Sequence, residues 1–180
     1  MNFCRRRFNL YLLALVFCLA ASGCVSSMFH HKKKEPVGIL RVHMESESSA
    51  AGTTKTVQVL RAQPVEVNIS VDPVLTEADV IAARLFDAPG GFAIQVNFEE
   101  TAGWRLEQYT AINPGKHLVI YGHWGEKPED GRWLAAPLVI RRISNCKLVF
   151  TPDATHEEAE TLVKGLNAAA KKNADVKSKD

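Results

Sequence analysis

Long apolar runs are missing from this sequence of 180 residues except near its start. The run from Leu10 to Ala20 follows arginines at positions 5, 6 and 7, and it is shorter than the roughly 20 residues that a membrane-spanning helix needs. A positive region followed by a short apolar run is typical of a bacterial secretory signal. We therefore assign residues 1–23 to a signal peptide and expect no transmembrane helix after it.

Cysteine is scarce, and its positions limit what a thiol can do. Cys4 and Cys18 lie in the signal, and the small residues 21–23 precede Cys24. This arrangement resembles a lipoprotein processing site, at which the sulfur receives a diacylglycerol and the cysteine becomes the mature N-terminus; a plain cleavable signal is the alternative. Because each buried methylene contributes about 0.8 kcal/mol, two or three acyl chains such as palmitate would hold Cys24 at a membrane.

The remaining thiol, Cys146, has no partner for an intrachain disulfide in the oxidising cell envelope. It precedes the apolar run "KLVF", so we expect a small buried core residue. The residue after Cys24 is Val25 and not aspartate. By resemblance to lipoprotein sorting rules, this points to the outer membrane, facing the periplasm.

A large excess of positive charge is also missing from the mature chain. Of 22 basic residues, three leave with the signal, so 19 remain against 20 acidic residues. This balance argues against a nucleic-acid partner, which would need a persistent basic patch. Residues 24–36 carry serines, charges and a proline and predict a tether. Within it, "HHKKKE" suits lipid headgroups better than a metal, because adjacent histidines without carboxylate or thiol partners rarely complete a coordination shell.

No set of residues has the spacing of a catalytic or metal site. Histidines occur singly at positions 43, 117, 123 and 156, and no motif surrounds Ser70, Cys146 or Glu100. His117 and His123 share a predicted strand but lie about 20 Å apart along it, too far to bind one metal. Glu99 and Glu100 suit the positive end of a helix. The sequence therefore predicts a protein that is not an enzyme and binds no cofactor.

Alternating apolar and polar residues predict most of the strands. The pattern occurs in "GILRVHME", "KTVQVLR", "VEVNISV", "GFAIQVNF", "KHLVIYG", "RWLAAPLVIRRI" and "KLVFT". In the sixth of these, Pro137 predicts an edge position or a bulge.

Three segments predict helices. The first, "TEADVIAARLF", begins with Thr76 and has an acidic residue three positions later, as in a capping box. The second spans 99–111 and ends at Asn-Pro-Gly. The third begins at Thr155 and places Ala159, Leu162, Val163 and Leu166 on one face, while the lysine-rich tail 171–180 is expected to be disordered.

These elements predict one domain over residues 37–170, with an α+β fold of mainly antiparallel sheet and helices packed on one face. The stretch from Asp72 to Asn167 resembles the head subdomain of the first periplasmic domain of the SecD/SecDF protein-export subunit. The resemblance rests on the order of "LT-x-x-D", "NPGK-x-L-x-I", "APLV" and "T-x-E-E-A". It implies a ferredoxin-like head module, which in that family is thought to hold an emerging preprotein while transmembrane segments use the proton gradient.

One connection is longer than the tight Asp-Gly turn usual in that family. It reads "GHWGEKPEDGRW" and is rich in glycine, aromatic and charged residues, which can contact another chain. Its candidate partner-binding residues are His123, Trp124, Glu126, Lys127, Glu129, Asp130 and Arg132. We expect Trp133 in the core and Trp124 at the surface, although both tryptophans folding back over the sheet is an equal alternative.

Two functional hypotheses follow. In the first, the chain is a lipid-anchored envelope protein that binds polypeptide or a partner through residues 122–133 or an exposed strand edge, with a possible link to export. Its partners would be an unfolded exported chain, a translocon component or an envelope protein. In the second, it is a structural or assembly lipoprotein with no role in export.

Overall fold

The computed structural model describes residues 38–47 and 52–177. The predicted signal peptide, the lipidation site Cys24 and the whole tether lie outside the described residues. In the part of the chain that is described, no helix is both long enough and apolar enough to cross a membrane.

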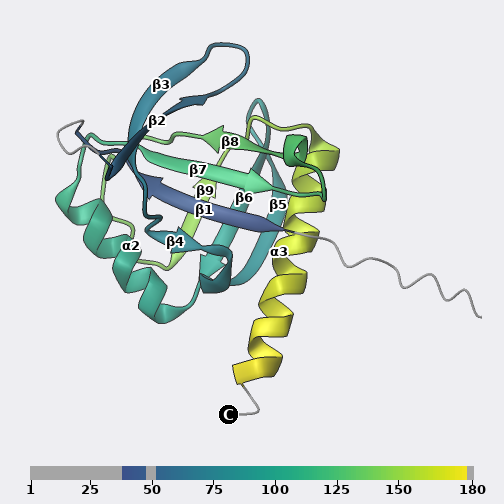
Figure 1. Cartoon of the computed structure of the whole chain (residues 1–180). Helices are drawn as coiled ribbons and strands as arrows, with labels where there is room; N and C mark the ends of the chain where they lie inside the picture. The colour runs from purple at the N-terminus through teal and green to yellow at the C-terminus, as the bar shows by residue number, and fades with distance from the viewer. Residues whose placement is uncertain (1–37, 48–51, 178–180) are drawn as a thin grey trace, which may run out of the picture. The chain divides into compact units, whose positions relative to one another are not determined.

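The strands form three hydrogen-bonded sets, and every pairing is antiparallel (Figure 1). The first set has the order β4-β1-β7-β8, with bounds Leu75–Thr76, Ile39–Met44, Leu118–His123 and Gly131–Ala135. The second pairs β2 (Thr54–Val59) with β3 (Val65–Ser70). The third has the order β5-β6-β9, with bounds Val80–Ala88, Gly91–Phe98 and Lys147–Phe150. With two helices, α2 (Glu100–Ile112) and α3 (His156–Lys177), this confirms the α+β class.

One apolar core joins the first and third sets of strands to both helices. Leu40 and Ile120 come from the first set, Val96 from the third, Leu106 from α2 and Leu162 from α3, and all are fully buried. Helix α3 lies alongside β5 (Figure 1). A second, smaller core lies under the β2-β3 hairpin and consists of Val57, Val59, Val67, Ile69 and Val119.

The helix predicted from Thr76 is wrong, because the segment forms β5 instead. The capping interaction exists, since Asp79 Oδ2 accepts a hydrogen bond from Thr76 N at 2.8 Å, but it supports only a 3₁₀ turn, η1 (Glu77–Asp79). A proline and Gly90 (φ +85°) then form the turn of a hairpin in which Ala88 faces Gly91. Tertiary pairing of the whole segment with β6 thus overrides a local helix signal.

The two other helices are confirmed, with one difference at the C-terminus. Ala159, Leu162 and Leu166 are buried on α3 as predicted, and Val163 is partly buried against the core. The helix continues to Lys177, seven residues into the tail that we expected to be disordered. Lys177 Nζ reaches Glu99 Oε2 at 2.5 Å, so the end of the helix has a contact on the body of the domain.

The strand predicted over "RWLAAPLVIRRI" ends early, at Ala135. Beyond it, Leu138 makes a single bridge to His117, and the chain then runs without regular structure to β9. Pro137 has no N–H to continue a ladder, which explains the break. Cys146, expected in the core, is only partly buried and adopts a left-handed conformation (φ 55°) just before β9.

Candidate functional site

The loop between β7 and β8 carries the predicted partner-binding residues, and its tryptophan is buried. Trp124 has 8% of its surface exposed and belongs to the main core, which contradicts its expected place at the surface. The guanidinium of Arg132 lies 4.7 Å from the centre of its ring, so a cation–π contact adds to the apolar packing. Trp133 is partly buried against the second core and packs edge-to-face with His43 and Tyr121.

Backbone and side-chain hydrogen bonds close this loop on itself. The N–H of Trp124 donates to the carbonyl of Asp130 at 3.0 Å, and Lys127 N donates to Asp130 Oδ2 at 3.0 Å. The ring of His123 bonds the carbonyl of Lys127 through Nε2. A short 3₁₀ turn, η2 (Pro128–Asp130), forms the tip. His123, Trp124 and Asp130 therefore already have partners inside the loop.

Arg132 fixes the end of the loop to the start of α3. Its Nε donates to the carbonyl of Asp153 at 3.0 Å, and its Nη2 pairs with Glu158. Glu158 also accepts from Thr155 N, in the capping box expected there. Of the seven candidate residues, Glu126, Lys127 and Glu129 are exposed, so a partner reaching this loop would meet mainly charge. Binding by the loop stays a prediction.

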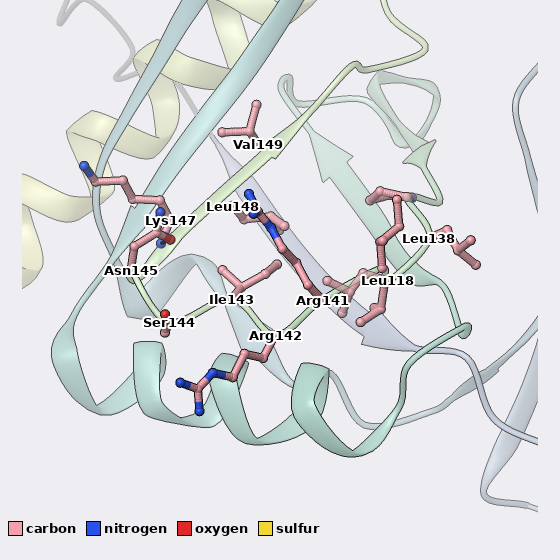
Figure 2. A pocket seen from close by; sticks show the side chains of 13 residues that line it. Leu118, Leu138, Arg141, Arg142, Ile143, Ser144, Asn145, Lys147, Leu148 and Val149 are labelled. Carbon is pink, nitrogen blue, oxygen red and sulfur yellow. Dashed lines mark hydrogen bonds between the residues drawn. The ribbon is translucent and has the colours of Figure 1, made fainter.

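A groove of about 610 Å³ lies elsewhere, between residues 137–145 and residues 147–149 of β9, and Leu118 also contributes to its lining. We call it the seam groove (Figure 2). Its size is within the range of about 300–1,000 Å³ usual for ligand sites. Leu138, Ile140 and Val149 are 50%, 84% and 49% exposed and contribute apolar surface to the same groove.

The charges of the seam groove all have one sign. Arg141, Arg142 and Lys147 contribute to its lining, and no acidic residue does. Arg142 points toward α2 and lies 3.5 Å from Glu107, whereas Arg141 and Lys147 have no ion-pair partner within the described residues (Figure 2). Aliphatic side chains beside unpaired cations favour a ligand that is both apolar and negatively charged.

The seam groove lies where two sheet edges separate. β8 is the edge of the first set of strands and β9 is the edge of the third. At one end the edges meet, because Asp153 N donates to the carbonyl of Leu134 at 2.7 Å. Towards Leu138 and Val149 they diverge, and no strand of the described chain lies between them. The only sequence signal for this opening was Pro137 within a predicted strand.

The histidines lie apart and have ordinary partners. His43 is buried, which lowers its pKa, and its Nδ1 bonds the carbonyl of Ser70. His117 Nδ1 lies 2.7 Å from Glu45 Oε2. Burial of Glu45 raises the pKa of its carboxyl, but the hydrogen bonds from His117 outweigh burial, so the pKa is lowered. His156 lies 3.6 Å from Glu160. Within residues 38–47 and 52–177, no three potential metal ligands come together.

No protein-family model matches the sequence, and comparison with curated proteins finds no match. Among solved structures, the chain is similar to SecDF, described there as a membrane component that enhances protein export. The identity is 20% and the TM-score 0.51, over 74% of this chain and 64% of that one. A SecDF crystal structure in a super-membrane-facing form gives 21% and 0.51, over 73% of this chain and 19% of that one.

This likeness shows the fold, and it confirms the SecDF-like domain that the sequence resemblance predicted. The chain spans less than two thirds of the length of either SecDF chain. The activity of the whole SecDF protein therefore does not transfer with the fold.

Proposed function

We propose that this chain is a lipid-anchored, non-enzymatic envelope protein whose SecDF-like domain holds a polypeptide in the seam groove. The chemistry of that groove is the observation that carries the proposal. Three large aliphatic side chains are about half exposed or more, and the same groove is lined by Arg141 and Lys147, which have no ion-pair partner among the described residues, and by Arg142, which pairs with Glu107. Exposed apolar groups that cluster on a surface usually mark an interaction site.

The proposed occupant is a segment of another polypeptide that is extended, partly apolar and acidic. The chain's own tether is a poor occupant, because its "HHKKKE" stretch repeats the positive charge of the groove. A second copy of the domain is disfavoured for the same reason, since Arg141 and Lys147 would approach their own counterparts. A newly exported chain offers such segments before it folds.

Two further parts of the proposal rest on observations outside the groove, one on the sequence and one on the fold. Lipidation of Cys24 would keep the domain at the outer membrane, facing the periplasm. A link to export is supported by the SecDF-like fold, because SecDF is described as enhancing protein export. Replacement of Cys24 by serine should abolish incorporation of labelled palmitate in cells, and retained label would contradict the anchor.

In-cell photocrosslinking tests the binding function. A photoreactive residue replaces Ile140, which is 84% exposed in the seam groove, and in a matched variant it replaces the exposed Glu126 of the loop. We expect pulse-labelled, newly exported chains to be captured from position 140 and not from position 126. Equal capture at both positions, or none at 140, would contradict the proposal.

The same experiment addresses the second hypothesis. If position 140 captures one discrete envelope protein in stoichiometric amount and no newly exported chains, the domain is an assembly lipoprotein and the proposed holding function is wrong. If position 126 alone captures a protein, the loop is the binding surface, as the sequence first suggested.

A further inference from the structure

The outer side of β9 presents backbone groups that have no strand to pair with. Phe98 N donates to the carbonyl of Cys146 at 2.9 Å, which makes these two residues a hydrogen-bonded pair. In an antiparallel ladder such pairs alternate with unbonded ones, so Leu148 and Phe150 also bond β6. The N–H and C=O of Lys147 and Val149 therefore point away from β6, into the seam groove.

The N–H of Lys147 already has a hydrogen-bond partner, and the position of that partner supports an N–H that points away from β6. Lys147 N donates to Asn145 Oδ1 at 3.2 Å, on the side away from β6. The C=O of Lys147 and both backbone groups of Val149 have no hydrogen-bond partner within the described residues. A partly exposed edge of this kind is a template for an additional strand.

The opposite side of the groove, residues 137–139, also has backbone groups that face the groove. Leu118 N donates to the carbonyl of Pro137 at 3.0 Å, and Val139 N donates to the carbonyl of Lys116 at 2.8 Å. Leu138 lies between these two bonds, opposite His117, so its own N–H and C=O point away from β7. The groove thus has strand-like backbone on both sides.

The two sides of the groove run antiparallel to each other. The bond from Asp153 N to the carbonyl of Leu134 joins them at one end, and residues 141–146 connect them at the other. Between these two ends the sides do not pair, because the cavity separates them. The seam groove is therefore a gap in what would otherwise be a continuous sheet.

We infer that the seam groove binds its polypeptide as an added β-strand, which pairs with β9 in antiparallel orientation and fills the gap between the two sheets. This inference rests on the proposed function and specifies how the same site recognises its ligand. Antiparallel pairing with β9 is more stable than parallel pairing, and it would make the added strand parallel to the segment at Leu138 on the other side of the groove. Main-chain hydrogen bonds would supply affinity for many different sequences.

The exposed side chains of β9 predict which sequences bind best. Lys147 and Val149 lie on one face of the strand, two residues apart, and both are exposed. On an antiparallel partner, the residue opposite Val149 precedes the residue opposite Lys147 by two positions. Directly opposite pairs interact most strongly, so the preferred pattern has an apolar residue opposite Val149 and, two positions later, an acidic residue opposite Lys147. The middle side chain faces Leu148 and should be apolar as well.

Binding of a designed peptide to the purified full-length chain tests this mode. The probe is the capped peptide Ser-Thr-Val-Val-Glu-Thr-Ser, measured by fluorescence polarisation. Methylation of the amide nitrogen of its first valine removes the hydrogen bond to Val149, and we expect binding to weaken about tenfold. Methylation of the first serine nitrogen, outside the predicted pairing, is the control and should change binding little. Lysine in place of glutamate should also weaken binding about tenfold.

Variants of the protein test the same bonds from the other side. Val149→Pro removes an N–H that points away from β6, so the pairing of β9 with β6 can remain. We expect it to weaken peptide binding about tenfold, and Val149→Ala, which keeps the N–H, to weaken it only two- to threefold. If Val149→Pro does not melt cooperatively, the N-methylated peptide decides alone.

The outcomes separate the inference from the proposed function. Binding that is unaffected by both the N-methyl group and the proline would overturn strand addition, while capture from position 140 would still support polypeptide holding. A probe that does not bind at all would also overturn strand addition with this pattern. Absence of both peptide binding and capture of exported chains would contradict the proposed holding function as well as strand addition.

Discussion

The loop of residues 123–132 and the seam groove both combine large apolar side chains with charges, but they use them differently. In the loop, Trp124 is buried, and Arg132 contacts its ring and pairs with Glu158. In the groove, Ile140 is the most exposed large apolar side chain of the described residues, and Arg141 has no ion-pair partner among them. Similar residue types therefore serve folding in one region and remain available for a ligand in the other.

This difference follows from the backbone around each region. The loop joins two neighbouring strands of one set, β7 and β8, so its side chains fall back onto that sheet and onto the start of α3. The groove lies between the edges of two different sets, which meet only near Leu134 and Asp153. A surface that the chain cannot cover with its own next strand is the better candidate for a partner.

The strongest test of the comparison is truncation of one apolar side chain in each region. Trp124→Ala should lower the free energy of unfolding by about 3–5 kcal/mol, because it removes a buried aromatic side chain and leaves a cavity. Ile140→Ala should change it by less than about 0.5 kcal/mol, since most of that side chain is in water. Urea denaturation of both variants measures the difference, and equal losses would contradict it.

Substitution of an arginine should also lower the free energy of unfolding more in the loop than in the groove. Arg132→Lys keeps the charge but loses the planar group that bonds Asp153, pairs with Glu158 and covers Trp124. We expect a loss of about 2 kcal/mol in the free energy of unfolding. Arg141→Lys in the groove is the matched control and should leave the free energy of unfolding unchanged. If Arg132→Lys also left it unchanged, these contacts would not hold the loop.

Reversal of charge should affect ligand binding in the groove and not in the loop. The double variant Arg141→Glu, Lys147→Glu should weaken binding of the acidic peptide about tenfold at low salt, and less at high salt because of screening. Lys127→Glu, at an exposed position of the loop, should leave binding unchanged. A salt-independent effect, or an equal effect of Lys127→Glu, would argue against charge complementarity in the groove.

The smallest expected effect concerns Asp153, where the two regions meet. Burial raises the pKa of Asp153, but hydrogen bonds and charge from Arg61 outweigh it and hold the pKa below the ordinary value of 3.8. A carboxyl whose pKa is lowered by folding stabilises the fold at pH values above its ordinary pKa. This stability is lost as the pH falls through the lower pKa of the folded state. Because Arg61 is largely exposed, the contribution should be at most about 1 kcal/mol.

Asp153→Asn measures this contribution, because it keeps the backbone bond from residue 153 to Leu134 and removes the charge. Below pH 3.8, the urea midpoint of the wild-type chain should fall more steeply with decreasing pH than that of the variant. Parallel pH profiles would show that the pair of Arg61 and Asp153 contributes nothing to stability.

The sequence alone determined those elements whose side-chain pattern also decides their packing. Alternation in "GILRVHME" and "GFAIQVNF" predicted β1 and β6, and the apolar face of 155–170 predicted α3, because each pattern buries one face whichever neighbour it meets. The SecDF-like fold was predicted from a resemblance to the SecD/SecDF head, which rests on the order and spacing of short motifs. The same reasoning failed for residues 80–88, where pairing with β6 overrode a capping box and an alanine-rich composition.

Only the tertiary structure decided which candidate surface stays open. The residues of the loop suit a partner as well as those of the groove do, and nothing local to Trp124 shows that Arg132 and the main core will cover it. The groove depends on the divergence of two sheet edges formed by strands that are separate in the sequence. Burial and backbone pairing are properties of the whole arrangement, so a pattern of residues can indicate an interaction surface without showing whether the fold already occupies it.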